Sequence, residues 1–332
     1  MVFDKRLLNQ FLAYFLQVRS SLWLASKEAV HCKELQKVLR GKGRRNILSK
    51  IVNIAKKPYL FVQLGDISSQ LIPVHFAGHP CDLKEINRIA KRHGLMVIED
   101  AAHALGAEYR LSGRGKWIRV GDGRFSDMTI LSFHPVKSIT TGEGGAVLTN
   151  DQRLYEKLLM LRNHGITKER KALLEKDEGP WYSEMEALGF NYRITDFQCA
   201  LGTSQLKRIG PFLKRRQEIV ALYNEKLSQL EEIVLPVTKP FVKSAWHIYC
   251  IRLKDPSKRK RVFEKLRNSN IGVQVHYIPV YFHPYYRRLG YKKGMCKRAE
   301  DYYRRTMTLP VHPGMTDRDV HYVVKTLKES FA

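Results

Sequence analysis

Two stretches of sequence decide the fold of this chain, Leu95–Tyr109 (LMVIEDAAHALGAEY) and Leu131–Gly145 (LSFHPVKSITTGEGG). Each begins with a short apolar run, the pattern of a buried strand in a parallel sheet. Asp100 follows the first run, and Lys137 lies in a turn after the second, because Pro135 prevents a regular helix there. Ligands of open α/β sheets bind beyond the carboxyl ends of the strands, so both side chains are predicted to face one crevice.

The sequence from Leu71 onward alternates strand-like and helix-like patterns. The predicted strands are Leu71–Phe76, Leu95–Glu99, Asp127–Phe133 and Gly145–Thr149, and the predicted helices are Asp82–His93, with Asp82 as its N-cap, and Leu154–Arg162. This alternation predicts an α/β fold, in which helices cover both faces of a mostly parallel sheet.

The pattern changes after Ile209 and predicts a smaller α+β domain at the carboxyl end. Its expected elements are a helix over Pro211–Leu230, a strand over Trp246–Leu253, a helix over Arg259–Asn268, a strand over Gly272–His276 and a last helix from about Asp317. We therefore divide the chain into an atypical basic segment (1–70), a large domain (71–225) and a small domain (226–332).

The composition is that of a globular protein with a core of its own: 332 residues, of which 44% are hydrophobic and 27% are charged. No apolar run reaches the length that a membrane-spanning helix needs. The five cysteines are scattered and form no CxxC pair, which argues against a zinc site or a disulfide framework. These observations favour a cytoplasmic location, no membrane partner and no bound metal.

The net charge of +26 first suggests a nucleic-acid or other anionic partner. Residues 1–60 hold 13 Lys and Arg against 3 Asp and Glu, a net +10, and the remaining charge is spread over many short stretches. No RNA-binding aromatic motif, Cys/His finger or basic zipper accompanies it, so we expect no dedicated nucleic-acid partner. A basic protein that binds RNA or other polyanions is kept as the third-ranked alternative.

A lysine held opposite a carboxylate over a crevice suits Schiff-base chemistry, because such a site favours a free amine that can attack an aldehyde. The glycines near the lysine let the backbone approach a ligand closely. Each residue alone also has an ordinary explanation. Asp100 could be a helix N-cap, His103 a surface histidine and Lys137 an exposed loop lysine.

Together the motifs are more specific, and the sequence resembles the DegT/DnrJ/EryC1/StrS family of pyridoxal-phosphate sugar aminotransferases, which have fold type I. Beyond the two stretches, the matching segments are RNHGITKE (162–169), LGFNYRITDFQCALGTSQLKRI (188–209), SAWHIYCIRL (244–253), VQVHYIPVYFHPYY (273–286) and AEDYYRRTMTLPVHPGMT (299–316). The resemblance covers residues 71–332. Its details are most similar to the branch that aminates UDP-linked 4-keto-6-deoxy-N-acetyl sugars.

The resemblance implies pyridoxal phosphate as cofactor and a role for each matching residue. Lys137 would capture the aldehyde of the cofactor and later move protons. Asp100 would pair with the protonated pyridine nitrogen, and His103 would lie near the ring oxygen. Ser132 would donate to the phosphate, and Asn191 would reach the phosphate across the interface of a homodimer with shared active sites.

The resemblance also implies two substrates, an amino-acid donor, expected to be glutamate, and a nucleotide-linked keto sugar. Arg193 would bind an anionic group such as the carboxylate of the donor, and His276 and Tyr277 would contact the sugar nucleotide. A structural ion pair for Arg193 and a buried core position for His276 remain equally open. The expected reaction runs in two halves, with ping-pong kinetics.

Residues 1–70 do not match the family, which carries there a small-residue turn that binds the cofactor phosphate and an aromatic side chain that stacks on the ring. Either this part is divergent, or the reading frame is truncated or shifted upstream of Leu71. The resulting hypothesis is that cofactor binding is weakened or lost. The second-ranked reading is therefore a catalytically impaired or inactive relative.

Overall fold

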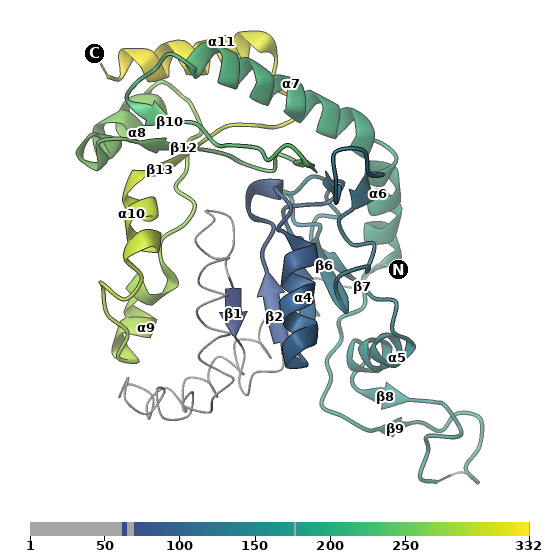
Figure 1. Ribbon diagram of the computed structural model, residues 1–332. Coiled ribbons are helices and arrows are strands. Elements are labelled where there is room, and N and C mark those ends of the chain that lie inside the picture. The colour runs from purple at the N-terminus through teal and green to yellow at the C-terminus, as the bar shows by residue number, and fades with distance from the viewer. Residues whose placement is uncertain (1–61, 65–69, 176, 332) are drawn as a thin grey trace.

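The computed structural model of the protein describes residues 62–64, 70–175 and 177–331 (Figure 1). Nearly all of the 1–70 segment lies outside these residues. The prediction that this segment lacks the phosphate-binding turn of the family therefore also falls outside the described residues. In the described part no helix is long and apolar enough to cross a membrane.

The central sheet contains five described strands in the order β1 (Val62–Leu64), β2 (Gln70–Pro73), β3 (Met96–Asp100), β6 (Met128–Ser132) and β7 (Gly145–Leu148). The pairs β2–β3 and β3–β6 are parallel, as predicted, whereas β1–β2 and β6–β7 are antiparallel. The β6–β7 pair is antiparallel because only a loop joins the two strands, and a parallel pair needs a crossover connection of a dozen or more residues.

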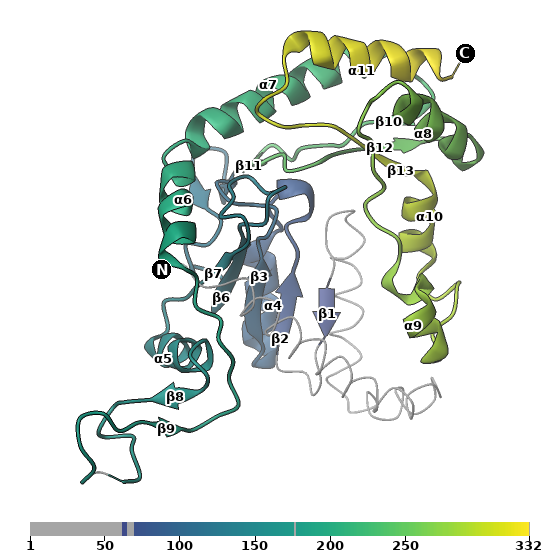
Figure 2. The same cartoon turned by 180° about the vertical axis from the view of Figure 1, so that it is seen from behind.

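Helices cover both faces of this sheet, as predicted. Helix α4 (Leu83–His93) lies in front of β2 and β3 in Figure 1 and behind them in Figure 2. Its buried residues pack against Leu71 and Val97, while helix α5 (Gln152–Leu161) packs Leu158 against the opposite face, which carries Ile72, Ile98 and Ile130. The predicted N-cap of α4 is confirmed, since the Asp82 side chain accepts a hydrogen bond from the Glu85 N–H.

Two small sheets and two helices connect the central sheet to the rest of the chain. The first sheet pairs β4 (Glu108–Tyr109) with β5 (Ile118–Arg119) and β11 (Val242–Lys243), and the second pairs β8 (Ile166–Thr167) with β9 (Glu184–Met185). Helices α6 (Asp196–Leu206) and α7 (Ile209–Leu227) follow, and the second half of α7 packs into a separate core.

That second core lies around an antiparallel sheet of β10 (Ile233–Val234), β12 (Tyr249–Leu253) and β13 (Thr306–Leu309). The other elements of this part are α8 (Arg259–Asn268), α9 (Pro284–Arg288), α10 (Lys297–Arg305) and α11 (Asp317–Glu329), with 3-10 turns η3 (Pro256–Lys258) and η4 (Val280–Phe282). Helices α7 and α11 run side by side over this sheet in both views (Figures 1 and 2). A domain boundary at residues 225/226, inside the last turn of α7, stays a prediction.

The strand predicted over Gly272–His276 is wrong. The chain bends where the Val273 N–H donates to the Ile271 carbonyl, and only one residue of the segment, Gln274, makes a β-bridge, to Thr308. A bend two residues before the bridge prevents the extended geometry that a longer ladder needs.

Candidate active site

Asp100 lies at the carboxyl end of the central strand β3, where the sequence places it. It shares a sheet face with Ser132 at the end of β6, because Asp100 pairs in register with Ile130 and side chains two residues apart point to the same side. The Asp100 carboxylate accepts a hydrogen bond from the Ala102 N–H at 3.1 Å. Burial raises the pKa of Asp100, against the lowering effects of that hydrogen bond and of the Lys137 charge.

Lys137 lies in the loop that joins β6 to β7, and this loop is closed at its base by backbone hydrogen bonds. Phe133 donates to the Gly144 carbonyl at 2.8 Å and accepts from the Thr141 N–H at 3.0 Å, while the Lys137 N–H donates to the His134 carbonyl at 2.9 Å. These bonds fix a tight turn in place of a helix, as Pro135 predicts. The lysine is half-buried and stands on a defined backbone.

Helix α6 supports this loop from outside. The Gln198 side-chain amide donates to the Glu143 carbonyl at 2.7 Å. Gly202 packs so closely on the loop that a Cβ there would lie 2.8 Å from Thr141. The helix therefore holds the far side of the loop that carries Lys137.

Three histidines lie within the electrostatic reach of Lys137, and all are held neutral. Burial and then the Lys137 charge lower the pKa of His103 to about 3. The same two causes lower the pKa of His276. Burial, followed by the nearby His103 ring and the Lys137 charge, lowers the pKa of His247. Each neutral imidazole can donate one hydrogen bond and accept another.

The structure thus brings together Asp100, Lys137, His103 and His276, four of the predicted site residues. Tyr277 belongs to the same group: burial raises its pKa to about 12, followed by the charges of Cys250 and Asp100. The tyrosine is half exposed, and its ring meets Phe76 edge-on with centroids 6.4 Å apart. The ring nitrogen Nδ1 of His276 lies 2.7 Å from the Thr308 hydroxyl.

Asn191 and Arg193 are placed differently. Both are exposed and are held against the segment that follows α5, through a β-bridge between Asn191 and Asn163 and a hydrogen bond from the Arg193 guanidinium to the Asn163 side chain. The Arg193 N–H also lies 3.5 Å from the side-chain oxygen of Asn191. Their predicted roles toward cofactor and donor stay predictions.

His247 is a site residue that the sequence did not single out, although it lies in the matching segment SAWHIYCIRL. Its ring stacks at a tilt on that of His103, with centroids 4.3 Å apart. The Nδ1 atoms of both rings are buried and have no hydrogen-bond partner among the described residues. A histidine two residues before the apolar strand β12 was the available signal, but the sequence does not show which residue it contacts.

The residues present fit pyridoxal phosphate. A buried polar atom without a partner costs about 1–3 kcal/mol, which a bound group can recover. The buried Asp100 carboxylate suits a cationic ring nitrogen, Lys137 suits an aldehyde, and the unpartnered Nδ1 of His103 suits a ring oxygen. Ser132 is buried on the same face as Asp100, where its hydroxyl could donate to an anionic group.

Comparison with known proteins agrees with this geometry. The model of the DegT/DnrJ/EryC1/StrS aminotransferase family matches residues 65–328. The uncharacterized protein MJ1066 of Methanocaldococcus jannaschii is 46% identical over 265 residues, which are 78% of this chain and 66% of that protein. A UDP-4-amino-4,6-dideoxy-N-acetyl-beta-L-altrosamine transaminase of Campylobacter jejuni is 38% identical over 256 residues, 76% of this chain and 63% of that protein. The chain therefore spans slightly less than two thirds of the length of these two relatives.

Solved structures give the same result. Helicobacter pylori PseC, an aminotransferase involved in the biosynthesis of pseudoaminic acid, is 31% identical with a TM-score of 0.69, and the match covers 78% of this chain and 66% of PseC. The PMP form of the sugar aminotransferase Spr1654 from Streptococcus pneumoniae is 27% identical with a TM-score of 0.69, covering 79% and 67%. The fold is that of the aminotransferases of fold type I, and the chain belongs to the DegT/DnrJ/EryC1/StrS aminotransferase family.

Proposed function

We propose that the protein is a pyridoxal-phosphate-dependent aminotransferase that moves an amino group from an amino acid, glutamate in our proposal, to the 4-keto group of a nucleotide-linked 6-deoxy sugar. The observation that carries this proposal is the grouping of Asp100, at the carboxyl end of β3, with Lys137 in the β6–β7 loop and with three neutral histidines from other segments. Glutamate would leave as 2-oxoglutarate, and the ketone of the sugar would become an amine.

The cofactor, when bound, supplies an aldehyde and an electron-withdrawing ring. Lys137 would bind that aldehyde through Nζ and, when a substrate amine displaces it, would hold and move a proton as general acid and base. Asp100 would bind the ring nitrogen and keep its proton in place, since a carboxylate in a buried site interacts strongly with a cation. His103 would orient the ring through a hydrogen bond from or to Nδ1.

The substrate assignment rests on the relatives and on the remaining residues of the site. The Campylobacter jejuni relative is named for a UDP-linked amino sugar. His276 and Tyr277 extend the Lys137 group towards the surface, where a sugar nucleotide could bind them, and Arg193 offers an exposed cation for a carboxylate. We propose a cytoplasmic role in the biosynthesis of a surface polysaccharide or nonulosonate.

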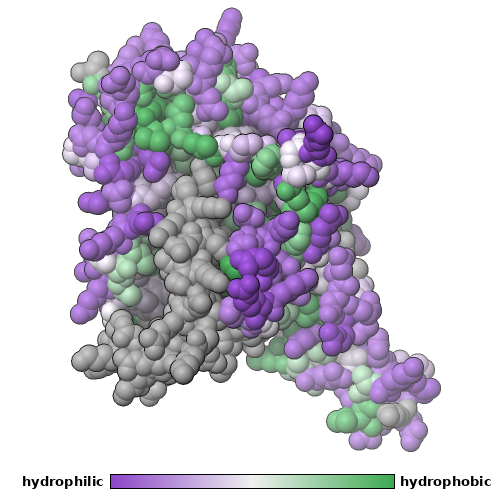
Figure 3. Space-filling view, viewed as in Figure 1, coloured by the Kyte–Doolittle hydropathy of each residue, from purple (hydrophilic) through white to green (hydrophobic). Residues whose placement is uncertain are grey.

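We further propose a homodimer with shared active sites. The stretch around Asn191 and helix α6 exposes large apolar side chains, among them Leu188 (75% exposed), Phe197 (90%) and Leu206 (51%), and α6 has no buried residue. The arm that carries β8 and β9 also shows apolar surface among its polar residues (Figure 3). A second copy of the chain would cover these side chains and could bring Asn191 to the partner's cofactor.

The test of the function is transamination itself. Purified protein, pyridoxal phosphate, glutamate and a UDP-linked 4-keto-6-deoxy-N-acetyl sugar should yield 2-oxoglutarate and amino sugar in equal amounts, with ping-pong kinetics. Mixing two inactive variants, Lys137→Ala and Asn191→Ala, should restore part of the activity, because a mixed dimer holds one intact shared site. No turnover by the wild type would refute the transaminase assignment, and no restoration on mixing would refute the shared site.

A further inference from the structure

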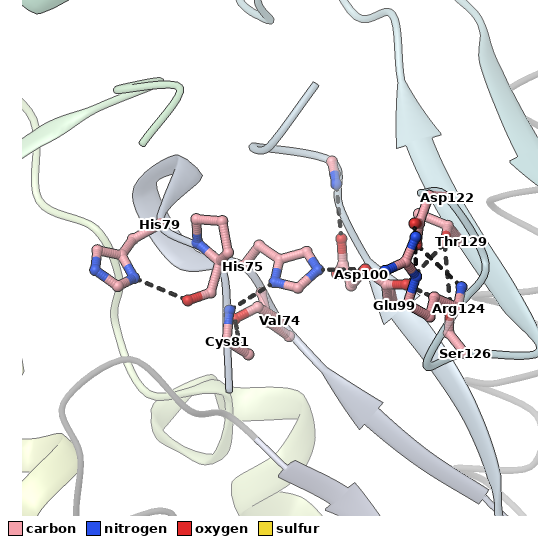
Figure 4. A network of polar contacts seen from close by, with 12 residues as sticks. Val74, His75, His79, Cys81, Glu99, Asp100, Asp122, Arg124, Ser126 and Thr129 are labelled. Atoms are coloured by element: carbon pink, nitrogen blue, oxygen red, sulfur yellow. Dashed lines mark hydrogen bonds and ion pairs between the residues drawn. The ribbon is translucent and has the colours of Figure 1, made fainter. Parts of the chain in front are cut away.

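A buried polar cluster lies directly behind Asp100, and none of the proposed chemistry uses it. His75 and Glu99, which are 0% and 1% exposed, contact each other through Nε2 and Oε2 at 2.8 Å. The other nitrogen of His75, Nδ1, accepts a hydrogen bond from the Cys81 N–H at 3.0 Å. Figure 4 shows the imidazole lying between these two partners. The Cys81 contact requires a lone pair on Nδ1, so the ring proton is assigned to Nε2, which donates to Glu99.

The Glu99 carboxylate accepts hydrogen bonds from three side chains. Besides His75, the hydroxyls of Ser126 and Thr129 donate to its Oε1 atom, the latter at 3.1 Å. Burial alone would raise the pKa of Glu99, but the hydrogen bond from His75, together with those from the two hydroxyls, holds it below the ordinary value. The carboxylate is therefore ionised and accepts three hydrogen bonds, which makes the cluster rigid.

This cluster and the catalytic carboxylate belong to the same strand end. Glu99 and Asp100 are consecutive in β3, so their side chains point to opposite faces of the sheet. The backbone of His75 is tied to the same point, because its N–H donates to the Asp100 carbonyl at 3.0 Å. One residue thus fixes the backbone of Asp100 from the neighbouring strand and, through Glu99, from the back of the sheet.

The turn after His75 then reaches the other half of the protein. This turn, η2 (Phe76–Gly78), has positive φ at Ala77 (61°) and at Gly78 (90°), and its carbonyls point to the segment before β12. The Ala77 carbonyl accepts from the His247 N–H at 3.0 Å, and the Gly78 carbonyl accepts from the Ala245 N–H at 2.9 Å.

Gly78 is wedged between the two parts that it joins. A Cβ at this position would lie 2.9 Å from the His103 carbonyl oxygen and 2.9 Å from the Trp246 nitrogen. Trp246 itself has a positive φ of 47°, a backbone conformation that a bulky side chain rarely adopts. The contact between the turn and the 245–247 segment is therefore close, and it requires unusual backbone conformations in both segments.

We propose that His75 and Glu99 are positioning residues: the buried pair fixes the end of β3 that carries Asp100 and, through η2, docks the 245–247 segment so that His247 lies against His103. The inference rests on the proposed function for its catalytic consequence, but not for the docking. It predicts that loss of the His75 side chain releases a segment more than 160 residues away in the sequence while the core around β12 and β13 stays folded.

The first experiment measures amide hydrogen exchange in the cofactor-free protein. In His75→Leu, the amides of Ala245 and His247 should exchange roughly tenfold faster or more. Each amide is protected by one hydrogen bond to a carbonyl of η2, and undocking of the segment breaks that bond. His75→Gln, which keeps a donor for Glu99, should show a smaller change. The matched control is Tyr223→Phe, which removes a buried hydrogen bond of 2.9 Å to the Pro310 carbonyl in the other core.

The second experiment measures kcat and KM of the same variants at equal cofactor saturation. We expect kcat to fall in the order wild type, His75→Gln, His75→Leu, with Tyr223→Phe at the wild-type value despite its lower stability. Unchanged exchange at Ala245 and His247 in a folded His75→Leu would overturn the docking role, and equal kcat in all variants would overturn the positioning of Asp100. If the wild type has no transaminase activity, the proposed function is contradicted. The hydrogen-exchange experiment does not depend on activity and still decides the docking role of His75.

Discussion

Acid should destabilise this protein through His103, and the size of the effect follows from its burial. The pKa of His103 falls from 6.5 to about 3 in the folded protein, mainly through burial and then through the Lys137 charge and the nearby His276 ring. Because the folded-state value is depressed, the unfolded chain takes up the proton first. The stability that the neutral ring provides is therefore complete above about pH 6.5 and is lost as the pH falls towards 3.

The loss of stability between about pH 7.5 and about pH 5 depends almost entirely on proton uptake by the unfolded state, since both of these pH values lie above the folded-state pKa of His103. Proton uptake by a free histidine over this interval amounts to about 2 kcal/mol of lost stability. His79 adds to the loss in the wild type, because burial lowers its pKa to about 4. The variant His103→Gln removes only the His103 contribution.

The assay is urea unfolding at the two pH values, followed by tryptophan fluorescence. The free energy of unfolding of the wild type should fall by about 2 kcal/mol more than that of His103→Gln over this interval. The matched control is Tyr322→Phe on α11, which removes a hydrogen bond to the Ser269 carbonyl and no histidine, and it should keep the wild-type pH dependence. Equal losses in wild type and His103→Gln would refute the conclusion that His103 is buried in its neutral form.

Three further changes test other parts of the structure. Asp100→Asn should weaken pyridoxal phosphate binding by roughly 10- to 100-fold, because a hydrogen bond to a charged group is worth about 1.5–3 kcal/mol; a fluorescence titration with unchanged affinity would contradict the pairing with the ring nitrogen. Gly78→Ala should cost at least about 2 kcal/mol of unfolding free energy, since its Cβ meets backbone atoms at 2.9 Å in a residue with φ of 90°, and a loss below about 0.5 kcal/mol in urea unfolding would argue against that close contact. Thr316→Ala removes the capping box at the start of α11 and should cost about 1 kcal/mol in the same assay, with no change in turnover if α11 is remote from the chemistry.

Local patterns were sufficient where the residues themselves determine the structure. Helix α8 has the predicted bounds Arg259–Asn268, and Asp82 caps α4, because apolar spacing and capping chemistry act within a few residues. The meeting of Asp100 and Lys137 followed from a general rule, that active groups gather at the carboxyl ends of neighbouring parallel strands.

The features that sequence reasoning missed depend on contacts between distant segments. Helix α6 (DFQCALGTSQL) lacks an apolar stripe and buries no side chain, so its periodicity gave no signal. The contact between His103 and His247 and the docking of η2 against Ala245 join the two halves of the chain, and no local pattern encodes them. The Gly272–His276 segment has alternating residues like a strand, but the bend around Gly272 lies at its start, and only Gln274 pairs, in a single bridge to Thr308.

The most direct test of the active-site assignment is chemical. The protein is incubated with pyridoxal phosphate, reduced with borohydride, digested and mapped by mass spectrometry, with Lys137→Arg as the control. A label on Lys137 in the wild type, and none at the corresponding peptide of the control, is the predicted result. A label on another lysine, or no label despite a folded protein, would contradict the assignment of Lys137 as the residue that binds the cofactor.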